Sequence, residues 1–342
     1  MCFQWKKPYL KKIIQYNIGI RSVCFTHTHT VLSDILILTD SGSHVLLLLL
    51  ELTAAFNTVD LTILLHRLEF WVGVTGTALE WFKSYLNGRC FSVPNVPLPW
   101  GVPQGSILGP LLFSIYILPL GKILASLGFN YHFYADDCQI YLQINQQHSF
   151  SIMSECLSQV RSWLSQNYLQ LNDSKSDAIL FSPTNMNGAL DVSTLPLNLK
   201  SCATSLGVKL DSDLSMSSQV NATVKSYFFQ LRRITRLKSI LKRPDIESVI
   251  HAFITSRLDY ANSVLIGINA SALSKLQKVQ NATARFLTNT DRRMHITPIL
   301  ADLHWLPVKF RINFKVRVRL APSVSSFKSA LKTHFFSIAF PP

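Results

Sequence analysis

Closely spaced cysteines are missing from this chain of 342 residues. The six cysteines stand at positions 2, 24, 90, 138, 156 and 202, which excludes a zinc site of the CxxC type and indicates no disulfide framework. A chain whose cysteines are widely spaced in this way suits a reducing intracellular compartment. The N-terminal lysines precede no signal-peptide core, because Gln15 and Asn17 interrupt it. We therefore expect a nuclear or cytoplasmic protein that is not secreted.

Long hydrophobic runs are missing as well. The longest uninterrupted apolar run, Val45 to Leu50, is far shorter than the roughly 20 residues that a membrane-spanning helix needs, and it is typical of a buried strand. Charged residues make up 15% of the chain and hydrophobic residues 48%, which excludes wholesale disorder. We expect two or three folded subdomains and no membrane partner.

Acidic residues are scarce in the last third of the chain. Residues 221–342 hold 20 Lys and Arg against 5 Asp and Glu, whereas residues 1–220 hold 13 against 14. The net charge of +14 therefore comes from the last third. A basic excess of this kind indicates an anionic partner, most simply nucleic acid, and a solvated basic surface is the alternative.

Two adjacent aspartates, Asp136 and Asp137, stand in the middle of the apolar, β-prone stretch FNYHFYADDCQIYLQI. Adjacent carboxylates repel each other and raise each other's pKa unless a cation neutralises them. A hairpin turn that carries both is therefore typical of a site for divalent metal ions. The alternative is an ordinary hairpin turn, in which Asp is common.

The residues around this hairpin predict a mixture of strands and helices. A helix end and a Ser-Gly turn precede a buried strand that closes on Glu51, and the alternating His27–Thr30 repeat is interpreted as a low-complexity tail. From residue 220 onward the pattern is helical, beginning with the stretch 225–243. The other predicted elements are helices near 61–68, 77–86, 151–169 and 271–287, a helix that starts near Pro244, and a strand at 178–181.

Five further residues are candidates for a nucleotidyl-transfer site. Glu51 ends an apolar strand and would converge with the two aspartates. Phe56 would lie flat under a sugar and exclude a 2′-hydroxyl, or it is an ordinary core residue. Gln104 would contact a base edge, and Gly105 with the other glycine of GVPQGS allows a close backbone approach. Lys175 would donate to a leaving pyrophosphate, unless it is a solvated surface lysine.

Four segments occur in the order of the palm motifs A, B, C and D of reverse transcriptases: ELTAAFNTVD, GVPQGSILGPLLF, FYADDCQIYL and LQLNDSKSDAILF. With SRLDYANSVL, SLGVKLDSDLS and ITPILADLHWLPVKFRINFKV, they resemble the reverse transcriptase of LINE-type (non-LTR) retrotransposons, especially the fish type, over about residues 31–318. The resemblance implies an α+β fold with a polymerase right-hand palm (an antiparallel sheet flanked by helices), then a basic helical thumb, with the fingers largely missing. The implied division is an unrelated N-terminal extension at 1–30, the palm with a finger remnant at 31–215, the thumb at 216–320 and a C-terminal remnant at 321–342.

The resemblance also implies RNA-directed DNA synthesis by two-metal nucleotidyl transfer. Glu51, Asp136 and Asp137 would hold Mg²⁺, with Mn²⁺ as an alternative, and Lys175 would be the motif D lysine. The expected partners are an RNA template, a DNA primer duplex and dNTPs, and no protein partner is assigned.

The same resemblance assigns the residues that contact nucleotide and nucleic acid. Phe56 would be the sugar gate, and Gln104 and Gly105 would contact the template or the nucleotide. The thumb would grip the phosphates of the duplex in a salt-dependent way through Arg232, Arg233, Arg236 and Lys242.

The chain departs from the family pattern in motif A. Glu51 stands where the family has Asp, and Asn57 stands where it usually has another Asp. Mg²⁺ demands near-ideal octahedral geometry, and a misplacement of about 1 Å can cost on the order of a hundredfold in rate. We therefore expect the activity to be reduced or lost. Two alternatives stay open: a non-catalytic nucleic-acid-binding remnant from a truncated copy, and a chain without selected function that folds only partly.

Overall fold

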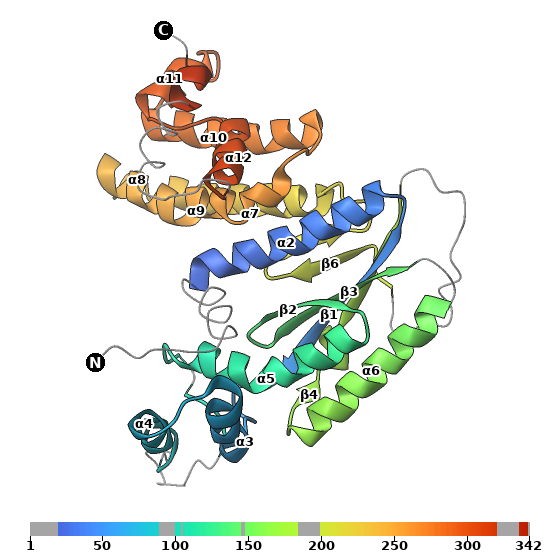
Figure 1. The fold of residues 1–342 in the computed structure, drawn as a ribbon. Coiled ribbons are helices and arrows are strands. Elements are labelled where there is room, and N and C mark those ends of the chain that lie inside the picture. Colours follow the sequence, from blue (N-terminus) through green and yellow to red (C-terminus); the bar gives the residue numbers. More distant parts are fainter. Residues whose placement is uncertain are drawn as a thin grey trace. The chain divides into compact units, whose positions relative to one another are not determined.

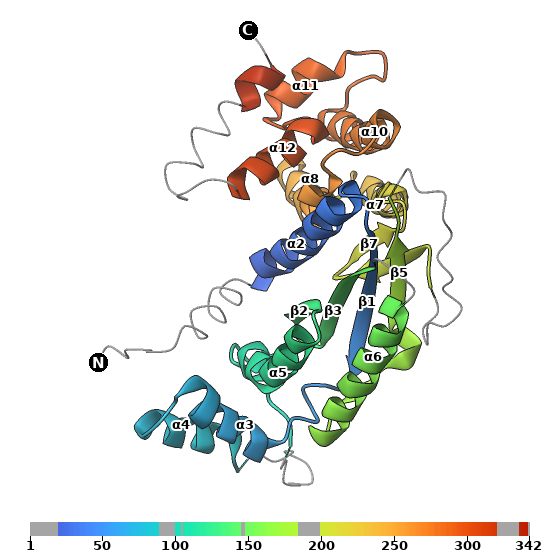
Figure 2. The ribbon, with the colours of Figure 1, turned by 45° about the vertical axis from the view of Figure 1, so that its right-hand side comes forward.

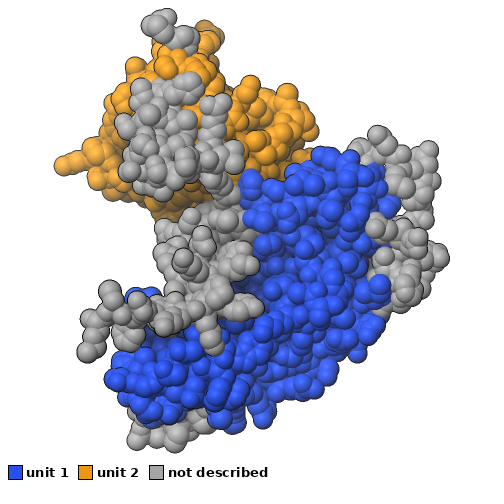
Figure 3. All heavy atoms as spheres, viewed as in Figure 1, with its two compact units in different colours: residues 1–206 blue, residues 207–342 orange. Residues whose placement is uncertain are grey.

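The computed structural model describes residues 20–88, 100–103, 105–144, 148–183, 199–319 and 335–340 (Figures 1 and 2). The chain divides into two compact units, residues 1–206 and 207–342 (Figure 3). The first unit is built on an antiparallel sheet with flanking helices, and the second is mainly helical. This composition confirms the predicted α+β fold class. The finer domain boundaries at residues 30, 215 and 320 stay predictions.

The sheet of the first unit has its longest strand at the centre. Its strands are β1 (His44–Thr53), β2 (Asn130–Tyr134), β3 (Asp137–Ile144), β4 (Gln170–Leu171) and β5 (Asp177–Phe181). β1 pairs antiparallel with β3, β4 and β5, and β2 pairs antiparallel with β3. A strand with neighbours on both edges and packed side chains on both faces meets little water. This position explains why the run Val45 to Leu50 is apolar throughout, and it confirms the predicted buried strand.

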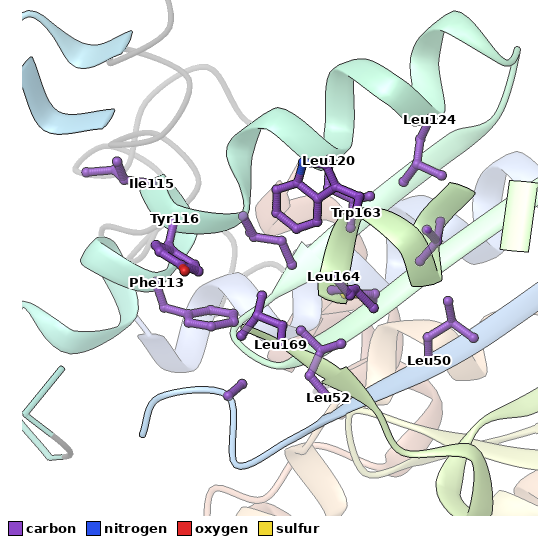
Figure 4. Close-up of a cluster of buried hydrophobic side chains, with 14 of the residues drawn as sticks. Leu50, Leu52, Phe113, Ile115, Tyr116, Leu120, Leu124, Trp163, Leu164 and Leu169 are labelled. Carbon is purple, nitrogen blue, oxygen red and sulfur yellow. The ribbon is translucent and has the colours of Figure 1, made fainter. Parts of the chain in front are cut away.

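Helices cover the sheet of the first unit. They are α2 (Ile20–Asp40), α3 (Leu61–Arg67), the π-helical η1 (Leu68–Val72), α4 (Thr77–Leu86), α5 (Gly109–Ser126), α6 (His148–Gln166) and the short η2 (Asp173–Lys175); the strand β6 (Cys202–Ser205) follows β5 along the chain. α2 and α6 lie on opposite sides of the sheet (Figures 1 and 2). Leu50 and Leu52 of β1 share one buried cluster with Phe113 and Leu120 of α5 and Trp163 of α6 (Figure 4). This cluster supports the strand end that carries Glu51.

Helix α2 corrects one interpretation of the sequence. The His27–Thr30 repeat lies inside α2 and is not a low-complexity tail. Thr28, Val31, Leu32 and Ile35 are all buried, and their spacing places them on one helical face. The polar repeat made this buried face hard to recognise in the sequence. Thr28 occupies a buried position at which helical periodicity predicts an apolar residue.

Helix α5 is the one helix of the described residues that is long and apolar enough to cross a membrane. Half of this stretch is buried inside the first unit. Phe113, Tyr116 and Leu120 lie in the core (Figure 4), as in the core helix of a folded domain.

The second unit begins with β7 (Val208–Asp211) and continues as helices. They are α7 (Ser217–Arg236), α8 (Arg243–Ile250), the π-helical η3 (His251–Thr255), α9 (Ser256–Asp259), the 3-10 helix η4 (Asn262–Leu265), α10 (Ala270–Thr288), α11 (Ile296–Asp302) and α12 (Val308–Arg319). The predicted helix at 225–243 was too long, because α7 ends at Arg236 and Lys242 is extended. Proline cannot continue a helix, since its ring collides with the preceding turn, so Pro244 lies in the first turn of α8, as predicted.

Candidate active site

The β2–β3 hairpin places the two aspartates beside the end of β1. Tyr134 pairs with Asp137 across the hairpin, and Ala135 takes a left-handed conformation (φ 53°) in the turn. The register of β1 on β3 places Asp137 directly opposite Glu51. The carbonyl of Asp136 accepts a hydrogen bond from the N–H of Leu52 at 3.2 Å, which extends the pairing into the turn. The structure therefore places the backbones of the three predicted acidic residues side by side.

The pKa of Asp137 is raised by its surroundings at this place. Burial is the main cause that raises it to about 6, and the charges of Asp136 and Glu51 raise it further. The ammonium of Lys175 acts in the opposite direction. A second cation at this site would relieve the remaining repulsion.

Lys175, the predicted motif D lysine, lies beside Glu51. β4 pairs with the end of β1, and the N–H of Asn172 donates to the carbonyl of Glu51 at 2.8 Å. These contacts bring η2 to the site, where Lys175 Nζ donates to Glu51 Oε1 at 2.5 Å. This hydrogen bond is the main cause that raises the pKa of Lys175. Lys175 is exposed, so the interaction is open to solvent.

The three acidic residues suit a divalent cation by their chemistry. All three offer carboxylate oxygens, which are the ligands that Mg²⁺ prefers. Across the described residues, however, no three His, Cys, Asp or Glu side chains lie close enough together to hold a metal ion. The carboxylate of Glu51 is paired with Lys175 instead. To hold a cation together with Asp136 and Asp137, Glu51 would have to leave this ion pair.

The GVPQGS segment packs against the backbone that follows Glu51. Val102 N–H donates to the carbonyl of Phe56 at 2.8 Å, and Gly101 N–H donates to that of Val59 at 2.7 Å. Gly101 has a φ of +80°, and a Cβ there would lie 3.0 Å from the backbone of Asn57. This glycine therefore admits a close approach of the chain's own backbone.

The other residues predicted to contact the nucleotide are placed as follows. The ring of Phe56 is half-buried and lies 5.0 Å from that of Phe113, between centroids. Gly105 is exposed, has a φ of +75° and has open space around its Cα. Gln104 lies outside the described residues.

A polar pocket of about 50 Å³ lies next to the acidic residues. Glu51, Asp137 and Lys175 line it together with Gln139 and Ser205, among others. Gln139 is buried and donates through Nε2 to Ser205 Oγ at 2.6 Å, while its Oε1 has no hydrogen-bond partner among the described residues. Neither Gln139 nor Ser205 was predicted from the sequence. The available signal was a glutamine two residues after Asp137, and therefore on the same face of an apolar strand.

The basic residues assigned to the thumb belong to the second unit. All four assigned residues are exposed, and the guanidinium of Arg233 lies 5.7 Å from the ring centroid of Phe229. Exposure leaves the charged groups accessible to an anionic partner. The four are Arg232, Arg233 and Arg236 on α7 and Lys242 just before α8.

Known proteins similar to this chain include transposon polymerases. In Drosophila melanogaster, the probable RNA-directed DNA polymerase from transposon X-element is 25% identical over 327 residues, which cover 87% of this chain and 34% of that protein. The corresponding protein from transposon BS is 25% identical over 261 residues, which cover 68% of this chain and 28% of that protein. The chain therefore spans about a third of the length of these relatives.

Two solved telomerase structures are also similar to the chain. The telomerase from Candida albicans, in complex with a TWJ fragment of telomeric RNA, has a TM-score of 0.42 and 11% identity over 98% of this chain and 56% of that one. The apo telomerase from Candida tropicalis has a TM-score of 0.44 and 10% identity over 97% of this chain and 58% of that one.

One protein family matches more than half of the chain. The family described as reverse transcriptase (RNA-dependent DNA polymerase) matches residues 7–210. The match begins ahead of residue 31, where the resemblance was expected to start, and it spans all four motifs from Glu51 to Phe181. This match confirms the predicted family at its broader level: the chain belongs to the reverse transcriptases.

Proposed function

We propose that this chain is the catalytic part of an RNA-directed DNA polymerase. The observation that carries the proposal is the antiparallel register that places Glu51 opposite Asp137, beside Asp136, in a family whose chemistry is reverse transcription. The substrates are an RNA template, a DNA primer and dNTPs. The 3′-hydroxyl of the primer attacks the α-phosphate of the incoming dNTP, and pyrophosphate leaves.

The acidic residues have the role of holding divalent cations, which the family generally uses. We propose Mg²⁺, with Mn²⁺ as the alternative, on Glu51, Asp136 and Asp137. When bound, the cations lower the pKa of the attacking hydroxyl and neutralise charge on the phosphates. Lys175, once Glu51 has turned away from it, would hold a proton within reach of the leaving pyrophosphate.

The nucleotide and the nucleic acid contact other residues in this proposal. Phe56 lies under the sugar of the incoming nucleotide and excludes a 2′-hydroxyl, and the contact of its ring with that of Phe113 supports this position. Gln104 and Gly105 contact the template or the nucleotide. The exposed cations of the second unit grip the duplex phosphates, which makes binding independent of sequence and sensitive to salt. They are Arg232, Arg233, Arg236 and Lys242.

Primer extension on an RNA template tests the proposed function. The native chain, Glu51→Asp and Asp136→Asn are compared with Mg²⁺ and with Mn²⁺. We expect weak extension by the native chain, stronger extension by Glu51→Asp and none by Asp136→Asn. No extension by either the native chain or Glu51→Asp would contradict the proposal.

The second candidate function is a non-catalytic nucleic-acid-binding protein. The observation that favours it is the ion pair between Glu51 and Lys175, which takes one carboxylate out of the cation site. It predicts duplex binding that weakens steeply with salt and is the same in Asp136→Asn, with no extension by any variant. The absence of binding at low salt rules it out. A fish-type LINE origin, truncation, and a nuclear or cytoplasmic location stay predictions from the sequence.

A further inference from the structure

The hydroxyl of Tyr116 joins two segments of the first unit that meet at helix α5. Tyr116 is fully buried, and its hydroxyl donates to the backbone carbonyl of Asn167 at 2.8 Å. The same oxygen accepts a hydrogen bond from the backbone N–H of Asp60 at 3.3 Å. Burial raises the pKa of Tyr116, so the hydroxyl keeps its proton at neutral pH. One hydroxyl therefore ties the end of the segment 56–60 to the turn between α6 and β4.

Arg67 of α3 holds Tyr116 in turn. Its guanidinium lies 4.5 Å from the ring centroid of Tyr116 and 5.4 Å from that of Trp163. Two of its N–H groups donate to the Tyr116 carbonyl and to Oδ1 of Asn167. Burial lowers the pKa of Arg67 to about 10, which leaves it charged at neutral pH. Because the guanidinium presents its donors in a fixed planar fork, Tyr116 and Asn167 are held in one orientation.

The segment 56–60 rests on the same helix at both of its ends. At its start, the ring of Phe56 packs on Phe113, which lies one helical turn before Tyr116 on α5 (Figure 4). At its end, Asp60 bonds to the Tyr116 hydroxyl. Between these points, the backbone accepts the two hydrogen bonds of the GVPQGS segment described above. Helix α5 thus sets the position of the Phe56 ring.

We propose that Tyr116 is a positioning residue for the choice between deoxyribose and ribose. Its hydroxyl fixes the segment 56–60, so that the Phe56 ring stays close enough to the sugar of the incoming nucleotide to exclude a 2′-hydroxyl. Arg67 keeps Tyr116 in place. Because Tyr116 is buried, it acts through Phe56. The inference rests on the proposed polymerase function and on Phe56 as the sugar gate.

Hydrogen exchange of the backbone amides tests the positioning step without any need for activity. Tyr116→Phe removes the hydroxyl and keeps the ring. Tyr141→Phe is the matched control, because it removes the hydroxyl of another buried tyrosine of the same unit, which donates to Asp34 at 2.5 Å. We expect Tyr116→Phe to speed exchange in residues 56–60 by about tenfold, and Tyr141→Phe to leave it unchanged. Equal exchange in the two variants overturns the inference.

The ratio of kcat/KM for a dNTP to that for the matching rNTP tests the effect on the sugar. Both substitutions are made in the native chain and in Glu51→Asp. We expect Tyr116→Phe to lower the ratio by at least about threefold, and Tyr141→Phe to leave it unchanged, since a general loss of stability affects both substrates alike. An unchanged ratio, despite faster exchange, overturns the role in sugar selection. Loss of extension in every variant contradicts the polymerase function instead, and exchange then decides the positioning role alone.

Discussion

Among the single residues of the site, Asp137 has the most informative charge. Its pKa is raised from 3.8 to about 6, mainly by burial and then by Asp136 and Glu51. The folded protein therefore binds this proton more readily than the unfolded chain does. The stability that goes with the proton is fully present below about pH 4, and it is lost as the pH rises through about 6.

Asp137→Asn tests the direction of this dependence of stability on pH. We expect it to raise the free energy of unfolding by about 1 kcal/mol at about pH 7.5, allowing for screening of a partly exposed group, and to change little at about pH 4. Urea unfolding in EDTA at the two pH values measures the difference. Asp40→Asn, which removes an exposed carboxylate from the same unit, is the control. If Asp137→Asn is less stable than the native chain at about pH 7.5, the charge of Asp137 does not destabilise the folded protein.

Gly101 packs closely enough on its neighbours to predict a second change in stability. In Gly101→Ala, the added methyl meets the backbone of Asn57 at 3.0 Å, in a conformation that L residues rarely adopt. We expect a loss of about 2–3 kcal/mol in the free energy of unfolding of the first unit. Gly128→Ala has a similar φ of +81° but nothing within 4 Å of the added Cβ, so it should lose only about 1 kcal/mol. Urea unfolding measures both losses in the free energy of unfolding. Equal losses in the two variants would contradict a contribution from close packing at Gly101.

Among the elements, the buried contacts of Arg67 join α3, α5 and α6. Arg67→Lys keeps the charge but loses the planar fork, which leaves Asn167 Oδ1 or the Tyr116 carbonyl without its donor. We expect a loss of about 2 kcal/mol in the free energy of unfolding. Arg161→Lys is the control, because it makes the same change in an exposed ion pair with Asp173, where the loss of the fork should cost about 0–1 kcal/mol. Similar losses in the two variants would contradict the buried network.

The elements themselves could largely be predicted from the sequence, because their signals are local. The helix predicted at 77–86 is α4, and the strand predicted at 178–181 is β5 with one more residue. The errors came where a distant contact decided the outcome. Thr28 is buried against the fold, and α7 ends where Leu237 and Ile240 lose burial. The hydrophobic periodicity of a segment does not show which of its residues will be buried against other elements.

Across the whole molecule, charge is separated between the sheet-based unit and the basic second unit. If the second unit grips duplex phosphates, Arg232→Gln with Arg236→Gln should weaken binding of an RNA–DNA duplex equally for different sequences. The slope of log K against log salt should become shallower by roughly 1 for each charge removed. Lys83→Gln is the control, because Lys83 is already paired with Glu80. A salt titration that gives the same slope for all three proteins would exclude these arginines from the contact.

Local sequence patterns were enough to predict the family, the buried central strand and the hairpin of Asp136 and Asp137, because each pattern depends on residues close together in the chain. The neighbours of Glu51 could not be predicted in this way. Its opposition to Asp137 depends on strand register, and its ion pair with Lys175 joins residues 124 positions apart. The roles of Gly101, Gln139 and Tyr116 likewise depend on what packs against them. Local patterns determine which elements form, whereas register and close packing determine which side chains meet.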